Sequence, residues 1–250
     1  MQVSEDFARV DVEVTRRPGQ IASWKHLGGF FLITAGITVA GFYSQGGGTG
    51  NAAPARQLAD HSLAIKFYLS AIFLDCAFLR YCWAGVQRYG GNLETLSGGR
   101  WKSWKDIASD VAIAVPFGVV WEATAYGVHS LMGASNAKSV DGLLPRNLVE
   151  ILLWIVVSIT AGFCEELIFR GYLQRQLQAL SSGVVAAVVA QGVVFGLAHS
   201  YQGWKQIVVI SVLGVLYGVL AAWRRNLRVN VITHAATDIW EGWLKMVMWR

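Results

Sequence analysis

Long apolar stretches separated by short polar segments dominate the order of hydrophobic and polar positions along this chain. A helix needs about 17 to 25 predominantly apolar residues to cross a bilayer. Stretches that reach or approach this length lie at 27–43, 63–86, 107–129, 148–169, 184–198, 207–223 and 229–248. The pattern predicts an all-α fold, a polytopic transmembrane helix bundle of about seven helices.

The composition favours the same class of protein. The chain is 54% hydrophobic and 15% charged, whereas a typical soluble domain is about 25% charged. The net charge of +5 needs no nucleic acid to explain it, because basic loops of a membrane protein are attracted to anionic lipid. We therefore expect a multi-pass integral membrane protein whose partners include membrane lipid and no nucleic acid.

The basic residues predict the orientation of the bundle, because short cytosolic loops are enriched in Lys and Arg. One set of alternate connections carries Arg9, Arg16, Arg17, Lys25, Arg88, Arg100, Lys102, Lys105, Arg170, Arg175, Arg224, Arg225 and Arg228. The other set carries only Arg56, Lys138, Arg146, Lys205 and Arg250. This asymmetry predicts a cytosolic N-terminus.

The same reading divides the chain into three parts. Residues 1–25 are too rich in charge to resemble a cleavable signal peptide, and we expect a cytosolic tail there. Residues 26–145 are expected to form the first three transmembrane helices with their connectors. Residues 146–250 form a second membrane unit, which carries the polar motifs described below and is predicted to be the catalytic core.

Charged residues also lie inside the second and third apolar stretches. They are Lys66, Asp75, Arg80, Asp110 and Glu122. Such residues are commonly explained by snorkelling of long side chains at helix ends or by structural pairing. We expect these explanations here and infer no transport path.

Two adjacent glutamates and an arginine end a very apolar run, in the sequence "FCEELIFRGYL". Glu166 and Arg170 are four residues apart, with the carboxylate on the N-terminal side, which favours an ion pair on one helix face. Glu165 lies about 100° around the helix from Glu166 and has no such partner. An unpaired carboxylate in a low-dielectric site suits a general base or a metal ligand.

Two later helices carry histidines within short polar motifs. "FGLAH" places Phe195 and His199 on one helix face, and "HAATD" places His234 and Asp238 on another. A lone histidine in a helix is more often a hydrogen-bonded core residue than a ligand, so each motif alone is weak evidence.

The three motifs are expected to lie at a similar depth in the membrane. Glu165 and His199 each lie about 24 Å from the "SSG" turn that joins their helices, at 1.5 Å per residue. His234 and Asp238 are expected about 9 and 15 Å into the membrane, measured from the predicted cytosolic end of their helix. The four groups can therefore share one layer in the cytosolic half of the membrane, where buried ionisable residues are usually functional.

These motifs resemble the CPBP family, which comprises CAAX prenyl endopeptidases and bacteriocin-processing (Abi) intramembrane proteases. Its three signatures are a double glutamate followed by arginine, Phe-x3-His, and His-x3-Asn or Asp. They are matched here, in order, by "EELIFR", "FGLAH" and "HAATD". The resemblance implies an enzyme that hydrolyses a peptide bond of a membrane-associated or lipidated substrate, of CAAX type or another kind.

The resemblance also implies a role for each matching residue. Glu165 would be the base, and His199 would help to hold or deprotonate the attacking water. His234 with Asp238 would face the scissile carbonyl. Glu166, paired with Arg170, would be structural support, and Phe195 belongs to the second signature.

The third motif departs from the well-known prenyl endopeptidases, which have Asn where this chain has Asp238. An ionised aspartate cannot donate a hydrogen bond to an oxyanion. Asp238 is therefore protonated, or orients His234, or ligates a metal. Glu165, His199 and His234 could supply the three protein ligands of a catalytic zinc, so a metalloprotease and a metal-free hydrolase both remain open.

The three cysteines, Cys76, Cys82 and Cys164, show no spacing typical of a disulfide or a metal site. We predict that they are small core residues. Cys164 could be proposed as a nucleophile with His199. It lies about 100° from Glu165 on the helix, and the family has no cysteine requirement there, so we disfavour that role.

The main alternative to a protease is a non-catalytic membrane scaffold or bacteriocin-immunity protein on the same fold. A scaffold would not need the unpaired Glu165. A proton transporter is a third class, but no inverted repeat supports it. The short chain and regular basic loops favour a bacterial cytoplasmic membrane, with the active site in the cytosolic half. The substrate's identity and the oligomeric state stay open.

Overall fold

The computed structural model describes residues 19–44, 61–132, 143–181 and 183–248. The helices are α2 (Trp24–Ser44), α3 (His61–Arg88), α4 (Leu93–Ser97), α5 (Trp104–Met132), α7 (Leu148–Glu165), α8 (Gln174–Ser181), α9 (Val184–Ala198), α10 (Trp204–Arg224) and α11 (Arg228–Met248). A π-helical segment, η2 (Glu166–Leu173), joins α7 to α8, and a 3₁₀ turn, η3 (Ser200–Gln202), precedes α10. No strand occurs in these ranges, which confirms the all-α prediction. Most of the predicted cytosolic tail, residues 1–18, lies outside them.

Every predicted apolar stretch is helical, but not every helix is long and apolar enough to be a membrane span on its own. Five stretches of the described chain meet both conditions: Trp24–Ser44, Ala64–Arg88, Trp104–Met132, Leu148–Ser181 and Trp204–Arg224. The helix α9 is apolar but has only 15 residues, because it ends just before His199. The helix α11 has 21 residues but carries Asn230, Thr233, His234, Thr237 and Asp238, so one of its faces is polar. The stretches expected at 184–198 and 229–248 are thus helices, as predicted, but neither is among these five.

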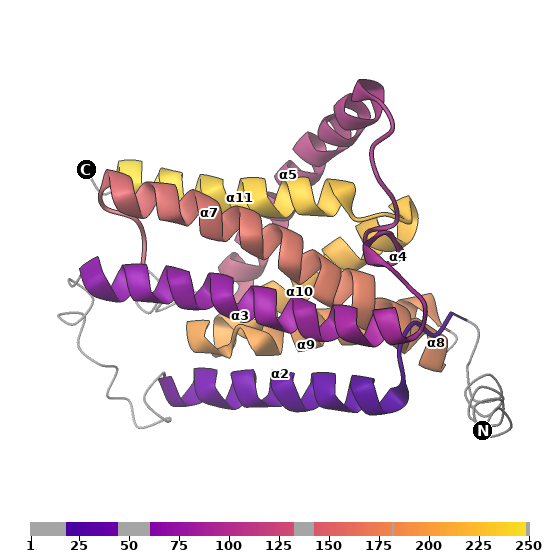
Figure 1. Ribbon diagram of the computed structural model, residues 1–250. Helices are drawn as coiled ribbons and strands as arrows, with labels where there is room; N and C mark the ends of the chain where they lie inside the picture. The colour runs from indigo at the N-terminus through magenta and orange to yellow at the C-terminus, as the bar shows by residue number, and fades with distance from the viewer. Residues whose placement is uncertain (1–18, 45–60, 133–142, 182, 249–250) are drawn as a thin grey trace, which may run out of the picture.

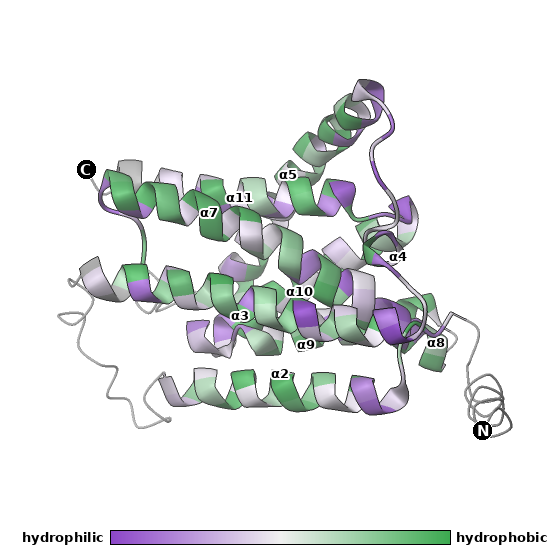
Figure 2. Cartoon of the chain, viewed as in Figure 1, coloured by the Kyte–Doolittle hydropathy of each residue, from purple (hydrophilic) through white to green (hydrophobic). Residues whose placement is uncertain are grey.

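The helices form a bundle with two distinct ends (Figure 1). The labels α4 and α8 and the start of α2 lie at the same end, while the C-terminus lies at the other. Hydrophobic residues cover α2, α3 and α7 over most of their length, and hydrophilic residues are more frequent near α4 and α8 (Figure 2). Large apolar side chains such as Leu32, Leu131 and Val185 are exposed, as expected where a helix faces lipid.

The stretch from α7 through η2 to α8 is one continuous helical run of 34 residues. All eight residues of η2 are buried, including Glu166 and Arg170. π-Helical turns are rare and occur frequently at functional sites. The sequence analysis treated this region as a regular α-helix, but α7 ends at Glu165 and η2 begins at Glu166. The first motif therefore lies on the junction between α7 and η2.

Glycines allow the helices that carry the motifs to cross at close range. A Cβ atom built on Gly162 of α7 would lie 2.7 Å from the backbone nitrogen of Ala235 in α11. A Cβ atom on Gly214 of α10 would lie 2.9 Å from the Cα atom of Gly192 in α9. Both crossings therefore require glycine. The first crossing lies beside His234. The second exposes the carbonyl of Gly214, which accepts a hydrogen bond from Arg170 of the first motif.

The buried charge of α5 is explained by pairing, as expected. Asp110 is fully buried and lies 2.8 Å from Arg224 Nη2 and 2.8 Å from Arg228 Nε. Trp101 Nε1 also donates to it, at 2.8 Å. This cluster ties the start of α5 to the connection between α10 and α11. In α3, Arg80 is exposed, with its guanidinium 5.4 Å from the Trp83 ring centroid.

Two of the cysteines follow the prediction and one does not. Cys82 and Cys164 are buried, whereas Cys76 is exposed. Cys76 lies on a side of α3 that faces outward, so it is not a core residue.

We expect Gly162→Ala to destabilise the protein. The added methyl group would force α7 away from α11, and such overpacking typically costs about 1–3 kcal/mol. The melting temperature in detergent should fall by several degrees. The matched control is Gly36→Ala in α2, where an added Cβ meets no described heavy atom within 4 Å. Equal melting temperatures for the two variants would show that the α7–α11 crossing is not close.

Candidate active site

The site is built around the carboxylate of Glu166, which is completely buried. Arg170 Nη1 donates to its Oε1 at 2.9 Å, which confirms the predicted pair. His234 Nδ1 lies 2.9 Å from the same oxygen, and Asn230 Nδ2 donates to Oε2 at 3.0 Å. One glutamate thus joins the first motif to α11. Asn230 was missed at the sequence level, although it lies one helical turn before His234 on the same face.

Arg170 is held by a second set of contacts. Its guanidinium carbon lies 4.3 Å from the centroid of the Phe195 ring and 5.1 Å from that of Tyr217. Its Nη2 donates to the carbonyl of Gly214 at 3.2 Å, which the close crossing of α9 and α10 brings within reach. Phe195 therefore stacks on the arginine of the first motif, which gives the phenylalanine of the second motif a physical role.

The contact with Glu166 determines how His234 presents its imidazole ring. A carboxylate can only accept a hydrogen bond, so Nδ1 carries the proton and donates it. The other nitrogen, Nε2, lies 3.7 Å from Glu165 Oε2 and 3.8 Å from Asp238 Oδ2. The ring also stacks on Tyr217, with centroids 5.3 Å apart. A neutral His234 would direct the lone pair of Nε2 toward Glu165.

His199 is oriented in a similar way by the backbone. It caps the C-terminus of α9, and its Nδ1 lies 2.9 Å from the carbonyl oxygen of Phe195. Since a carbonyl only accepts, Nδ1 again carries the proton. Nε2 is 3.8 Å from Glu165 Oε1. Both histidines thus turn the same nitrogen toward the same glutamate.

Glu165 lies between these two imidazoles. Its Oε2 is buried and has no hydrogen-bond partner in the described part of the chain. The side chains of Glu165 and His199 are 15% and 16% exposed, and that of Asp238 is 34% exposed, whereas Glu166 and Arg170 are inaccessible. The structure therefore brings together the four residues that the sequence proposed as catalytic, which are Glu165, His199, His234 and Asp238. The pair Glu166 and Arg170 is buried behind them.

Two further residues lie close to this group and were not predicted. Asp75 of α3 interacts electrostatically with Glu165, His234 and Asp238. Tyr201 of η3 interacts electrostatically with Glu165, Asp238 and Asp75. A signal existed for Asp75, which is a charge at the middle of an apolar stretch. Tyr201 follows His199 by two residues, and only the turn η3 directs it back to the site.

Glu165, His199 and His234, the possible zinc ligands of the sequence analysis, lie close together. Two imidazoles and a carboxylate suit zinc by their chemistry. Within the described residues, however, no three or more His, Cys, Asp or Glu side chains are arranged to hold a metal ion. The contacts of 3.7 and 3.8 Å leave the histidine nitrogens facing the glutamate itself. We therefore derive no step through a metal.

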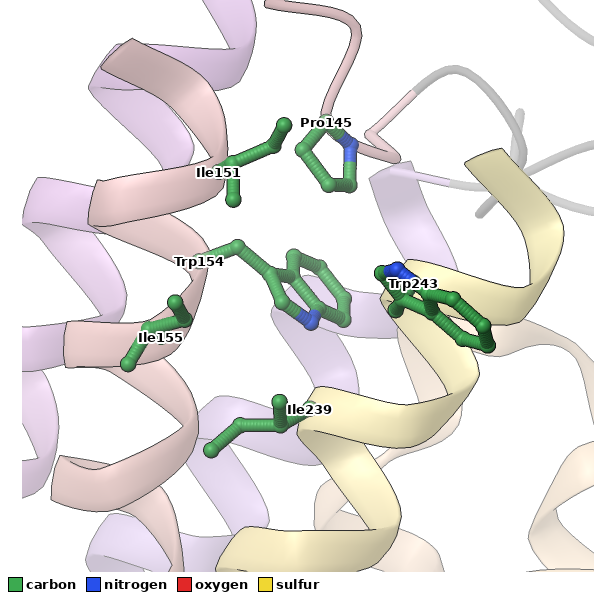
Figure 3. Close-up of a pocket in the computed structure, with 7 residues that line it drawn as sticks. Pro145, Ile151, Trp154, Ile155, Ile239 and Trp243 are labelled. Atoms are coloured by element: carbon green, nitrogen blue, oxygen red, sulfur yellow. The ribbon is translucent and has the colours of Figure 1, made fainter. Parts of the chain in front are cut away.

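An apolar cavity of about 100 Å³ lies next to Asp238, between α7 and α11 (Figure 3). Trp154 and Trp243 face each other across it, and Ile239 closes one side. The indole nitrogen of Trp154 donates to the backbone carbonyl of Asp238 at 2.9 Å. The wall of this cavity is thus bonded directly to the third motif.

A wider and more open groove of about 460 Å³ lies between α3 and α7. Its walls include Cys164, Phe163 and Arg80. Cys164 is the chain neighbour of Glu165, but none of the three motifs supplies a residue to the lining of this groove. The cysteine itself makes no contact with His199 that would favour a nucleophilic pair.

Comparison with known proteins gives one match. Residues 147–240 match the family model of the type II CAAX prenyl endopeptidase Rce1-like proteins. The matched segment runs from the start of α7 into α11 and contains all three motifs, which confirms the resemblance that these motifs indicated. Neither the curated proteins nor the solved structures give a significant match.

Loss of Arg170 should destabilise the protein strongly. Removing one partner of a buried ion pair typically costs about 3–5 kcal/mol, because a charge is left unpaired. We expect Arg170→Met to lower the free energy of unfolding by this amount in a detergent titration. The control is Arg100→Met, since Arg100 pairs with Glu94 on the surface and its side chain is 83% exposed. Such surface pairs contribute about 0–1 kcal/mol, so similar losses in the two variants would contradict the prediction.

Proposed function

Residues 147–240 carry a domain of the Rce1-like type II CAAX prenyl endopeptidase family, and from this premise we propose that the protein is an intramembrane endopeptidase. Its substrate would be a membrane-associated or lipidated peptide or protein. The observation that carries the proposal is Glu165, whose Oε2 is buried without a hydrogen bond to any described residue and faces two histidines. A carboxylate that served only the fold would have a partner, as Glu166 does.

The first step is activation of water. Glu165 Oε1 and His199 Nε2 are 3.8 Å apart, which is too long for a direct hydrogen bond. A water molecule beside this pair can bond to both groups. Glu165 would accept one proton of that water while His199 holds the oxygen in place. The resulting hydroxide attacks the carbonyl carbon of the peptide bond.

The second step is collapse of the tetrahedral intermediate. Glu165 would return its proton to the leaving nitrogen and the C–N bond would break. The products would be a carboxylic acid and an amine, which become a carboxylate and an ammonium group when the acid proton passes to the amine. One residue serves first as base and then as acid, so no proton is left over. Glu165 therefore needs no permanent partner, which fits its place between two imidazoles.

His234 would act on the other side of the scissile carbonyl. When its Nε2 is protonated, it can donate a hydrogen bond to the oxyanion while Glu166 holds Nδ1. Asp238, whose Oδ2 is 3.8 Å from Nε2, would orient this ring. Of the three roles that the sequence left open for Asp238, this one needs neither a metal nor a protonated carboxyl group.

The cavities support access from the membrane. We infer that a substrate held in the lipid enters at the groove between α3 and α7, whose walls include Cys164, the chain neighbour of Glu165. We propose that the end of the bundle with α4, α8 and the start of α2 (Figure 1) is the cytosolic one, and that the site lies in the cytosolic half of a bacterial cytoplasmic membrane. These segments adjoin the most basic connections of the sequence.

The test of the proposed function is Glu165→Gln. The substitution keeps the size and polarity of the side chain but removes the base. We expect protein termini present in membranes of cells with the wild type to be absent from cells with the variant at equal expression. The expected fall in their rate of formation is at least about 10²-fold, the usual contribution of general base catalysis.

The matched control is Glu94→Gln, which changes a surface glutamate that pairs with Arg100. It should give the wild-type set of termini. If wild type and Glu165→Gln give the same termini, the proposed protease is wrong, and a non-catalytic scaffold or immunity protein becomes the better interpretation.

We also expect hydrolysis without zinc, because Glu165, His199 and His234 do not form a metal-binding group as they lie. Formation of the new termini should continue at an unchanged rate after treatment with 1,10-phenanthroline. Metal analysis of the purified protein should give well under one zinc per chain. Loss of activity that added zinc restores would contradict this prediction and favour the metalloprotease.

A further inference from the structure

Tyr201 places its ring beside His199 of the candidate active site. Its ring centroid lies 6.0 Å from that of His199 and 5.9 Å from that of Phe67 in α3. The side chain is half-buried, and it interacts electrostatically with Glu165, Asp238 and Asp75. The ring of Tyr201 thus lies beside the imidazole of His199, within the electrostatic reach of the carboxylates of the site.

The proton of this hydroxyl is available for a further hydrogen bond. The oxygen accepts a hydrogen bond from Gln202 Nε2 at 3.0 Å. Within the described chain, no group accepts one from Tyr201 in return. Gln202 belongs to the same turn, so it fixes the oxygen and leaves the O–H bond to point elsewhere.

The proposed reaction needs such a donor. Negative charge develops on the carbonyl oxygen beside Asp238 and Asp75, neither of which donates when ionised. His234 donates from Nε2 only when the ring is charged, because Nδ1 is bound to Glu166. Transition states of this kind are usually stabilised by preorganised neutral donors.

We propose that the Tyr201 hydroxyl is a catalytic group that donates a hydrogen bond to the oxyanion of the tetrahedral intermediate. The inference rests on the proposed function and adds a residue to it. Tyr201 would provide the neutral donor that Asp238 cannot. No covalent bond to the tyrosine forms, and its proton stays on the phenolic oxygen throughout.

The other donors near the site are less suitable. Arg170 is buried, and it is already bonded to Glu166 and Gly214. Tyr217 is also buried, with its ring stacked on that of His234. Tyr201 combines an available proton with a half-buried side chain beside His199.

The experiment compares Tyr201→Phe with the wild type in the rate at which Glu165-dependent termini appear at equal expression. Phenylalanine keeps the ring contacts with His199 and Phe67 and removes the donor. We expect the rate to fall by about 10²- to 10³-fold, the usual effect of losing one oxyanion donor. The melting temperature should stay within a degree of the wild-type value, and Tyr126→Phe on the exposed side of α5 should change neither quantity.

A second variant separates chemistry from structure. Asn at position 238 keeps the size of the side chain and one carbonyl oxygen near His234, and its amide nitrogen adds a neutral donor. Asp238→Asn combined with Tyr201→Phe should therefore be at least tenfold faster than Tyr201→Phe alone. A structural defect at Tyr201 would not be repaired in this way.

The outcomes are distinct. If the wild type gives no Glu165-dependent termini, the proposed function itself is wrong, and the inference falls with it. If the wild type is active and Tyr201→Phe is equally fast, only the role of Tyr201 is overturned. A slow Tyr201→Phe that the Asn substitution does not accelerate also overturns it.

Discussion

The buried carboxylate of Glu166 is the interaction on which the rest of the site depends. It accepts hydrogen bonds from Arg170, His234 and Asn230, so it joins η2 to α11. A charge buried in a membrane protein is costly unless it is paired. The three donors meet that requirement. The hydrogen bond that His234 donates from Nδ1 also fixes the tautomer and the direction of its ring. The adjacent Glu165 is left free to face both histidines.

Backbone geometry makes this arrangement possible. The π-helical segment η2 starts at Glu166, so adjacent glutamates lie at the junction of two helical forms and point to different surroundings. Gly162 lets α7 approach α11, and Gly214 lets α10 present a carbonyl to Arg170. The accessible residues thus depend on close helix crossings that lie one or two turns away from them.

Much of the fold could be predicted, because a membrane span leaves a long apolar signal. The pairing of Glu166 with Arg170 followed from their spacing, and the common layer of Glu165, His199 and His234 followed from counting residues to helix ends. The stretches expected at 184–198 and 229–248 are the helices α9 (Val184–Ala198) and α11 (Arg228–Met248). What the sequence did not indicate has physical reasons. Asp75 was noted as a charge but not placed, since no spacing within α3 indicates its neighbours.

The sequence by itself determined the class of protein, the helices and the three motifs, because these depend on composition and on contacts within one helix. Only the tertiary structure decided which nitrogen each histidine turns toward Glu165. It alone revealed that Asn230 completes the partners of Glu166 and that Tyr201 returns to the site from η3. These contacts join residues that are far apart in the chain. Their geometry depends on how helices cross and on a local π-helical turn, which no periodicity of side chains encodes.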